Sequence, residues 1–163
     1  MLAGQIGAGW IRGGAWMTVR RIVTEEVDGR SRIVDDGPAP STWCDEIWAT
    51  TPDHPLGRVS TAPARELSAR PGGTFFRMVK LSPDAVVRAA MAGRAVNEVD
   101  SEGFHRTPTV DYVYVLDGPV ELVLDDTSVV VQPGDCVVQR GTNHAWRNHG
   151  TEPIRLLAVM IGV

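Results

Sequence analysis

Short apolar runs, rich in β-branched residues and separated by turn residues, recur along most of the chain. From residue 110 onward this pattern is regular, and it predicts strands over Val110–Leu116, Val120–Leu124, Ser128–Val131, Cys136–Gln139, His144–Arg147 and Ile154–Ile161. Turn sequences such as Asp117-Gly118 and Pro133-Gly134-Asp135 separate these runs. Strands this short, about 8–12 residues apart, are typical of an antiparallel sandwich or barrel.

The first half of the chain is less regular. Strands are expected over Thr18–Thr24, Arg32–Asp35, Glu46–Thr51 and Thr74–Leu81, with a long loop over 52–73. The pattern over 85–94 is ambiguous, and a short helix is one interpretation of it. We therefore expect an all-β fold with a barrel over 74–163 and N-terminal strands and a loop over 17–73 that pack on it. Residues 1–16 hold five glycines and two tryptophans, and are expected to form a flexible extension.

Composition narrows the functional classes. The chain has 163 residues, of which 43% are apolar and 22% charged, as expected for one globular domain. The net charge is −4 and no segment concentrates basic residues, which argues against nucleic acid as a partner. No apolar run approaches the roughly 20 residues of a membrane helix. Cys44 and Cys136 match no metal-binding spacing, so we expect two free thiols and a cytoplasmic protein.

Two groups of polar residues stand at spacings that suit a site. The first is His105-x-Thr107-x3-Asp111-x6-Gly118, and the second is Gly134-x6-Gly141-x2-His144-x3-Asn148. Alternate residues of an extended segment share a face. His105 should therefore point the same way as Thr107, and Asp111 the same way as Val113 and Val115.

These two groups resemble the two conserved motifs of the cupin superfamily. His105 falls on the first His of the first motif and Asp111 on its Glu, whereas Thr107 stands in place of the second His. In the second motif, Gln139 stands where a Pro is usual. The string GDCVVQRGTNHAWRN is similar to a largely uncharacterised subgroup of small single-domain cupins associated with polyketide and aromatic-compound metabolism.

The resemblance implies a double-stranded β-helix, or jelly-roll barrel, with a ligand site at its mouth. It also implies a divalent metal (Fe, Mn, Ni, Co or Zn) held by His105, Asp111 and His144. We expect the donor atoms of these three residues to converge on one point. Residues expected to line the ligand site are Thr107, Val113, Val115, Gln139 and Trp146.

The function implied is binding of a small molecule, followed by metal-dependent chemistry on a carbonyl- or aromatic-containing metabolite. Decarboxylation, isomerisation, cyclisation and dioxygenation all remain open, because cupins host many reactions. Two alternatives stand beside this reading. One is a metal-free enzyme in which His105 and Asp111 act as the catalytic acid–base pair, and the other is a ligand-binding cupin without catalysis.

Several residues also have plain structural interpretations. Asp111 would be a buried carboxylate paired with Arg77 or Arg106. Cys136 is expected to be buried, Asn148 to stabilise a turn and His149 to face solvent. Tyr112 and Tyr114 are expected on the outer face of the barrel, where they and the N-terminal strands would contact a second copy of the chain in a homodimer.

Overall fold

The fold is almost entirely β-sheet. The computed structural model describes residues 11–12, 15–16, 18–60, 66–91 and 99–163. Within these ranges one helix, α1 (Asp84–Met91), accompanies the strands β1 (Ile11–Arg12), β2 (Ala15–Trp16), β3 (Arg20–Val27), β4 (Arg30–Pro38), β5 (Cys44–Thr50), β6 (Thr74–Leu81), β7 (Thr109–Val115), β8 (Val120–Val123), β9 (Ser128–Val131), β10 (Cys136–Arg140), β11 (Ala145–Arg147) and β12 (Ile154–Gly162).

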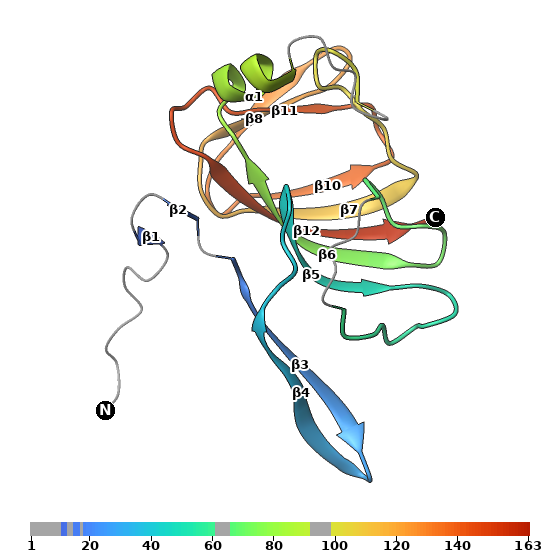
Figure 1. Cartoon of the computed structure of the whole chain (residues 1–163). Helices are drawn as coiled ribbons and strands as arrows, with labels where there is room; N and C mark the ends of the chain where they lie inside the picture. The colour runs from blue at the N-terminus through green and yellow to red at the C-terminus, as the bar shows by residue number, and fades with distance from the viewer. Residues whose placement is uncertain (1–10, 13–14, 17, 61–65, 92–98) are drawn as a thin grey trace.

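Two antiparallel sheets form the barrel. The larger has the strand order β10-β7-β12-β6-β5 and the smaller has the order β11-β8-β9. The sheets face one another, and α1 lies at the end of the barrel near β8 and β11 (Figure 1). The predicted jelly-roll barrel is thereby confirmed. Of the ambiguous segment 85–94, residues 85–91 belong to α1, and the remainder lies outside the described residues.

Strict alternation along the central strands fixes which side chains enter the barrel. In β12, every second residue from Ile154 onward is buried, and in β7 the buried residues are Thr109, Asp111, Val113 and Val115. The inward apolar residues of both sheets form one core, made of Val113, Val115, Val120, Leu122, Val131, Ile154, Leu156 and Ala158. Tyr112 and Tyr114 point outward, as their positions in the alternation predict.

The N-terminal strands divide into two groups. Strand β5 pairs with β6 and so extends the larger sheet of the barrel. Strands β3 and β4 pair with each other, and their hairpin projects away from the barrel (Figure 1). Most of the expected extension over residues 1–16 lies outside the described residues. Among the described residues, no helix is both long and apolar enough to cross a membrane.

Candidate functional site

His105 and His144 lie side by side, although they belong to different sequence motifs. The backbone of each accepts a hydrogen bond from the other, with N···O distances of 3.0 Å in both directions. This short antiparallel bridge brings the two imidazole rings to a centroid distance of 4.2 Å. Gly141 helps to place His144, because its φ of +62° is in the left-handed region that suits glycine at the turn after β10.

Both imidazoles are oriented by the backbone. The Nδ1 atom of His105 lies 3.2 Å from the carbonyl oxygen of Gly103, and that of His144 lies 3.0 Å from the carbonyl of Thr142. A carbonyl can only accept, so Nδ1 is the donor in each ring, and in the neutral form of each ring Nε2 keeps its lone pair. Burial lowers the pKa of His144 to about 4, which keeps this ring neutral near pH 7.

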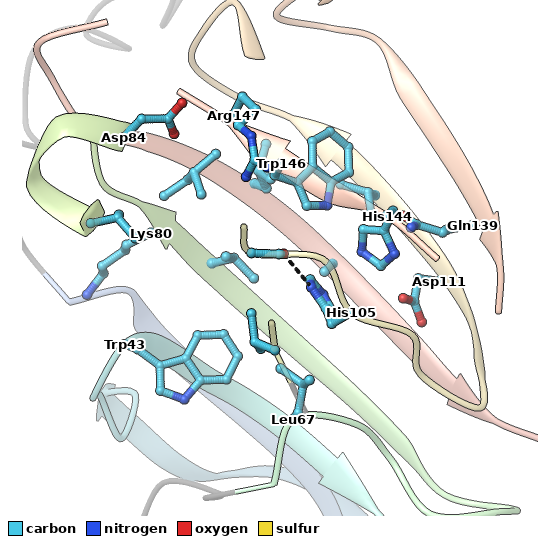
Figure 2. A pocket seen from close by; sticks show the side chains of 18 of the residues that line it. Trp43, Leu67, Lys80, Asp84, His105, Asp111, Gln139, His144, Trp146 and Arg147 are labelled. Carbon is cyan, nitrogen blue, oxygen red and sulfur yellow. Dashed lines mark hydrogen bonds between the residues drawn. The ribbon is translucent and has the colours of Figure 1, made fainter. Parts of the chain in front are cut away.

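Asp111 adds a carboxylate to the same region. Its side chain points inward from β7 and lies near the two imidazoles (Figure 2). Burial raises the pKa of Asp111, although a hydrogen bond from Thr109 and the charge of His105 act in the opposite direction. One of its oxygens, Oδ1, is buried without a hydrogen-bond partner among the described residues. Arg77, one of the two arginines considered as a partner for Asp111, instead forms an ion pair with Glu46.

A cavity of about 550 Å³ opens beside these three residues. Its wall is mainly apolar and is made by both sheets, by α1 and by the segment before His105. The apolar lining residues are Trp43, Leu67, Val79, Leu81, Val87, Val99, Val113, Trp146, Leu156, Ala158 and Met160. A cavity of this size and character suits a small organic molecule.

The predicted lining residues divide between cavity and core. Val113, Gln139 and Trp146 line the cavity, but Thr107 and Val115 do not. The hydroxyl of Thr107 lies 2.8 Å from that of Thr109, so its hydrogen bond is made within the protein rather than toward a ligand. Val115 belongs to the apolar core. For these two residues, contact with a ligand stays a prediction.

The predicted metal ligands share one cavity but do not form a compact donor group. His105, Asp111 and His144 all line it, and two imidazoles with one carboxylate match the donor types that Fe(II), Mn, Ni, Co and Zn accept. However, no three His, Cys, Asp or Glu side chains in the described part of the chain are placed so that they could hold a metal together. The expected convergence on one point is therefore not present in this structure.

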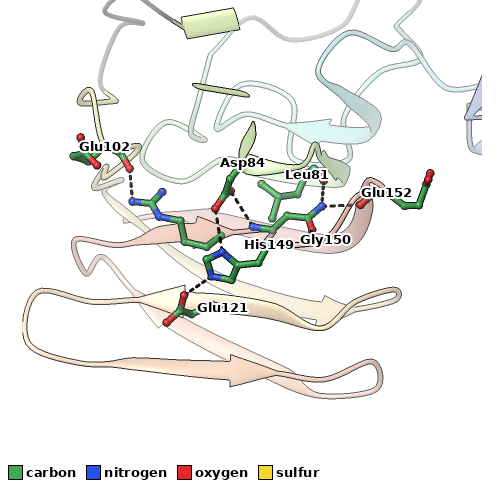
Figure 3. A network of polar contacts seen from close by, with 9 residues as sticks. Leu81, Asp84, Glu102, Glu121, His149, Gly150 and Glu152 are labelled. Carbon is green, nitrogen blue, oxygen red and sulfur yellow. Dashed lines mark hydrogen bonds and ion pairs between the residues drawn. The ribbon is translucent and has the colours of Figure 1, made fainter. Parts of the chain in front are cut away.

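A polar network fixes the end of the cavity near α1. Asp84, the first residue of α1, lines the cavity and accepts a hydrogen bond from the backbone N–H of Asn148. His149 lies between Asp84 and Glu121, with Nε2 2.7 Å from the Glu121 carboxylate (Figure 3). Arg147 donates to the backbone carbonyl of Glu102, and both residues line the cavity. These contacts hold α1 and the segment before His105 against the barrel.

Some residues of the cavity wall carry little or no signal in the sequence. Lys80 and Trp43 lie on the side of the cavity away from Asp111 (Figure 2). Lys80 donates to Asp45, with Nζ 2.6 Å from Oδ1. It is the only lysine in a chain with 15 arginines, and this is the one feature of the sequence that sets it apart. Trp43 follows a proline-rich stretch without periodicity, so no pattern indicated where its side chain points.

The structural roles expected for Asn148 and His149 are confirmed, whereas the role expected for Cys136 is not. Asn148 makes the expected turn contact, because its Oδ1 accepts from the N–H of Gly150, and His149 is exposed. Cys136 is exposed rather than buried, whereas Cys44 is buried, and both thiols are free. The prediction for Cys136 is wrong because it shares the outward face of β10 with Val138. The inward-facing residues of this stretch are Val137 and Gln139.

Comparison with known proteins agrees with the barrel and its two motifs. Residues 95–160 match the Cupin domain family. Over 91 residues the chain is 41% identical to Phomopsin biosynthesis cluster protein C' of Diaporthe leptostromiformis, an alignment that covers 55% of this chain and 39% of that protein. Over 61 residues it is 41% identical to the cupin-domain-containing oxidoreductase fogC of Aspergillus ruber, covering 35% of this chain and 30% of that protein.

Solved structures are more distant. A Cupin 2 conserved barrel domain protein from Salinispora arenicola is 17% identical, with a TM-score of 0.39 and coverage of 62% of this chain and 71% of that chain. The two sheets and the cavity between them define a small β-barrel with a cavity at one end. Residues 95–160 match the Cupin domain family, and the chain is similar to proteins of fungal biosynthesis clusters. The matched region spans less than half the length of the two curated relatives described above.

Proposed function

We propose that this chain is a cupin enzyme that acts on a largely apolar metabolite carrying a carbonyl or aromatic group. His105, His144 and Asp111 are the residues at the reacting end of the cavity. One observation carries the proposal: both imidazoles bind backbone carbonyls through Nδ1, so the neutral form of each ring presents an unprotonated Nε2 beside a buried carboxylate. Such a cluster at the wall of an apolar cavity is suited to chemistry rather than to packing.

A divalent metal is part of this proposal. His105 and His144 would supply nitrogen ligands through Nε2 and Asp111 an oxygen ligand, and the metal could be Fe, Mn, Ni, Co or Zn. The bonds from Nδ1 to backbone carbonyls are the orientation that metal-binding histidines need. When bound, such a metal polarises an oxygen of the substrate. Because the three side chains do not form a compact group, we expect weaker affinity than that of a four-ligand cupin site.

A metal-free acid–base reaction is the second candidate, and the absence of a compact donor group in the described residues favours it. In this form Asp111, whose pKa is raised by burial, gives a proton to an oxygen of the substrate. The unprotonated Nε2 of His105 removes a proton from a neighbouring atom. The apolar wall excludes water and holds the carbon skeleton of the substrate.

The relatives support the choice of substrate class. One carries the name of a biosynthesis cluster protein and another that of a cupin-domain-containing oxidoreductase. Both names favour work on a specialised metabolite over binding of a macromolecule. The apolar lining of the cavity favours the same class.

Metal titration of protein purified without a histidine tag tests the proposal. Fe(II) (without oxygen), Mn(II), Ni(II), Co(II) and Zn(II) are added to the wild type and to the variants His105→Ala, His144→Ala and Asp111→Asn, with heat measured by calorimetry. The exposed His149 provides the control variant His149→Ala. We expect one site in the wild type and the control, no site in either cavity-histidine variant, and weaker binding in Asp111→Asn.

The same titration distinguishes the two candidates. Failure of all five metals to bind the wild type would refute the metal-dependent form and leave the acid–base pair as the leading mechanism. Equal binding by the wild type and both cavity-histidine variants would place the metal elsewhere, and would also count against the metal-dependent form.

A further inference from the structure

We infer that Gln139 and Asp111 form a donor–acceptor pair that selects ligands carrying a carbonyl next to a hydroxyl. This inference deepens the proposed function, because it rests on ligand binding in the same cavity. It adds the chemical class of the group that is recognised and a residue, Gln139, that determines specificity without taking part in metal binding or proton transfer.

The two side chains lie side by side on the inner face of two paired strands. Gln139 in β10 is the register partner of Asp111 in β7, and both line the cavity. Gln139 is 4% exposed and Asp111 is 6% exposed. Even so, Nε2 of Gln139 and Oδ1 of Asp111 have no hydrogen-bond partner among the described residues. They do not bind each other either, although one is a donor and the other an acceptor.

Buried polar atoms of folded proteins nearly always have a partner, and an unpartnered one costs stability. The other unpartnered atoms are explained locally. Glu46 and Arg77 are bound to each other through their remaining atoms, and the second oxygen of Asp84 lies 3.5 Å from His149. Nε2 of Gln139 and Oδ1 of Asp111 have no such contact among the described residues. The missing partner of the Gln139 amide is therefore a group that enters the cavity.

The chemistry of the two atoms defines that group. An amide N–H donates, so Nε2 requires an acceptor such as a carbonyl oxygen, and it cannot serve as a metal ligand. A carboxylate oxygen accepts, so Oδ1 of Asp111 requires a donor such as a hydroxyl. Register partners on neighbouring strands are close together, so the acceptor and the donor belong on adjacent atoms of one ligand. The surrounding apolar wall fits a hydrocarbon or aromatic remainder.

Three matched probes test the inference: 2-hydroxy-1-(2-naphthyl)ethanone, 1-(2-naphthyl)ethanone and 2-ethylnaphthalene. They share a naphthyl body and carry, respectively, both groups, the carbonyl alone and neither. Binding is measured by quenching of tryptophan fluorescence in buffer with EDTA. We expect affinity to fall by roughly tenfold for each group removed, because each loss leaves a buried atom unpaired again.

Variants assign the groups to residues. Gln139→Met keeps the side-chain volume but removes the donor, so it should abolish the preference for 1-(2-naphthyl)ethanone over 2-ethylnaphthalene. Asp111→Leu should abolish the preference for the hydroxyl. The exposed Gln132 provides the matched control Gln132→Met, which should bind all probes as the wild type does.

Thermal unfolding gives a second readout. If the amide of Gln139 has no partner inside the protein, Gln139→Met should not lower the melting temperature. A decrease of more than about 4 °C would show that the amide stabilises the fold and would overturn the inference. Equal affinity of the wild type for all three probes would overturn it as well, while leaving the proposed function standing. Binding of no probe at all would count against both.

Discussion

The side chain of Asn148 binds three backbone groups at the end of the cavity. We predict that Asn148→Ala strongly destabilises the protein. This side chain is fully buried. Its Nδ2 donates to the carbonyls of Leu81 at 3.0 Å and Glu152 at 2.8 Å, and its Oδ1 accepts from Gly150 at 2.9 Å. Three bonds at about 1 kcal/mol each predict a loss of about 3 kcal/mol in the free energy of unfolding, and more if the carbonyls stay unpaired.

Urea unfolding followed by fluorescence measures this loss. In a chain of this length, the same change lowers the melting temperature by roughly 6–12 °C. Asn143→Ala is the matched control, because Asn143 makes one exposed hydrogen bond, to Asp125, and its loss should cost less than about 1 kcal/mol. Equal and small losses in the two variants would refute the reasoning that buried contacts of Asn148 hold this end of the barrel.

Three further predictions concern charge and assembly. Arg77→Met should lower the free energy of unfolding in urea by about 3 kcal/mol or more, since it leaves Glu46 buried without its partner. Adding Glu46→Leu should recover most of that loss, and no recovery would contradict the prediction. In EDTA, the free energy of unfolding should fall by up to about 3 kcal/mol as pH decreases from 6.5 toward 4. The cause is that the pKa of His144 is lowered to about 4 in the folded protein, so the unfolded chain takes up the proton first. If the wild type loses stability with pH as little as His144→Leu does, this prediction is wrong. Light scattering should give about twice the chain mass of 17.7 kDa, because Tyr112 and Tyr114 are 50% and 42% exposed on the outer sheet face; a stable monomer would exclude the homodimer.

The fold could be predicted from the sequence because short apolar runs recur at regular spacing after residue 110, and turn residues mark where the strands end. Cys136 shows where this reasoning fails. Strand β10 has apolar residues on both faces, so alternation alone did not decide which face is inside.

The candidate site could be predicted only in part. Spacing placed His105, His144 and Asp111 at one cavity because motif spacing follows strand register. Spacing could not predict the hydrogen bond between Thr107 and Thr109, because the partner of the Thr107 hydroxyl depends on which polar group is nearest to it in the folded protein. Nor could it assign Lys80 and Trp43 to the wall, because the segment that brings Trp43 there has no periodic pattern. The absence of a compact donor group in the described residues depends on side-chain geometry, which the spacing of residues in the sequence does not predict.

The central claim is that His105 and His144 present unprotonated Nε2 atoms to the cavity, and long-range ¹H–¹⁵N NMR of the imidazoles tests it most directly. The chain has four histidines, so the variants His105→Ala and His144→Ala assign the signals. At pH 7.5 both rings should be Nδ1-protonated, because Nδ1 donates to the carbonyls of Gly103 and Thr142. Addition of Zn(II) or of 2-hydroxy-1-(2-naphthyl)ethanone should shift the Nε2 signals of these two rings and not that of His149. Nε2-protonated rings, or Nε2 signals that neither addition moves, would contradict the account.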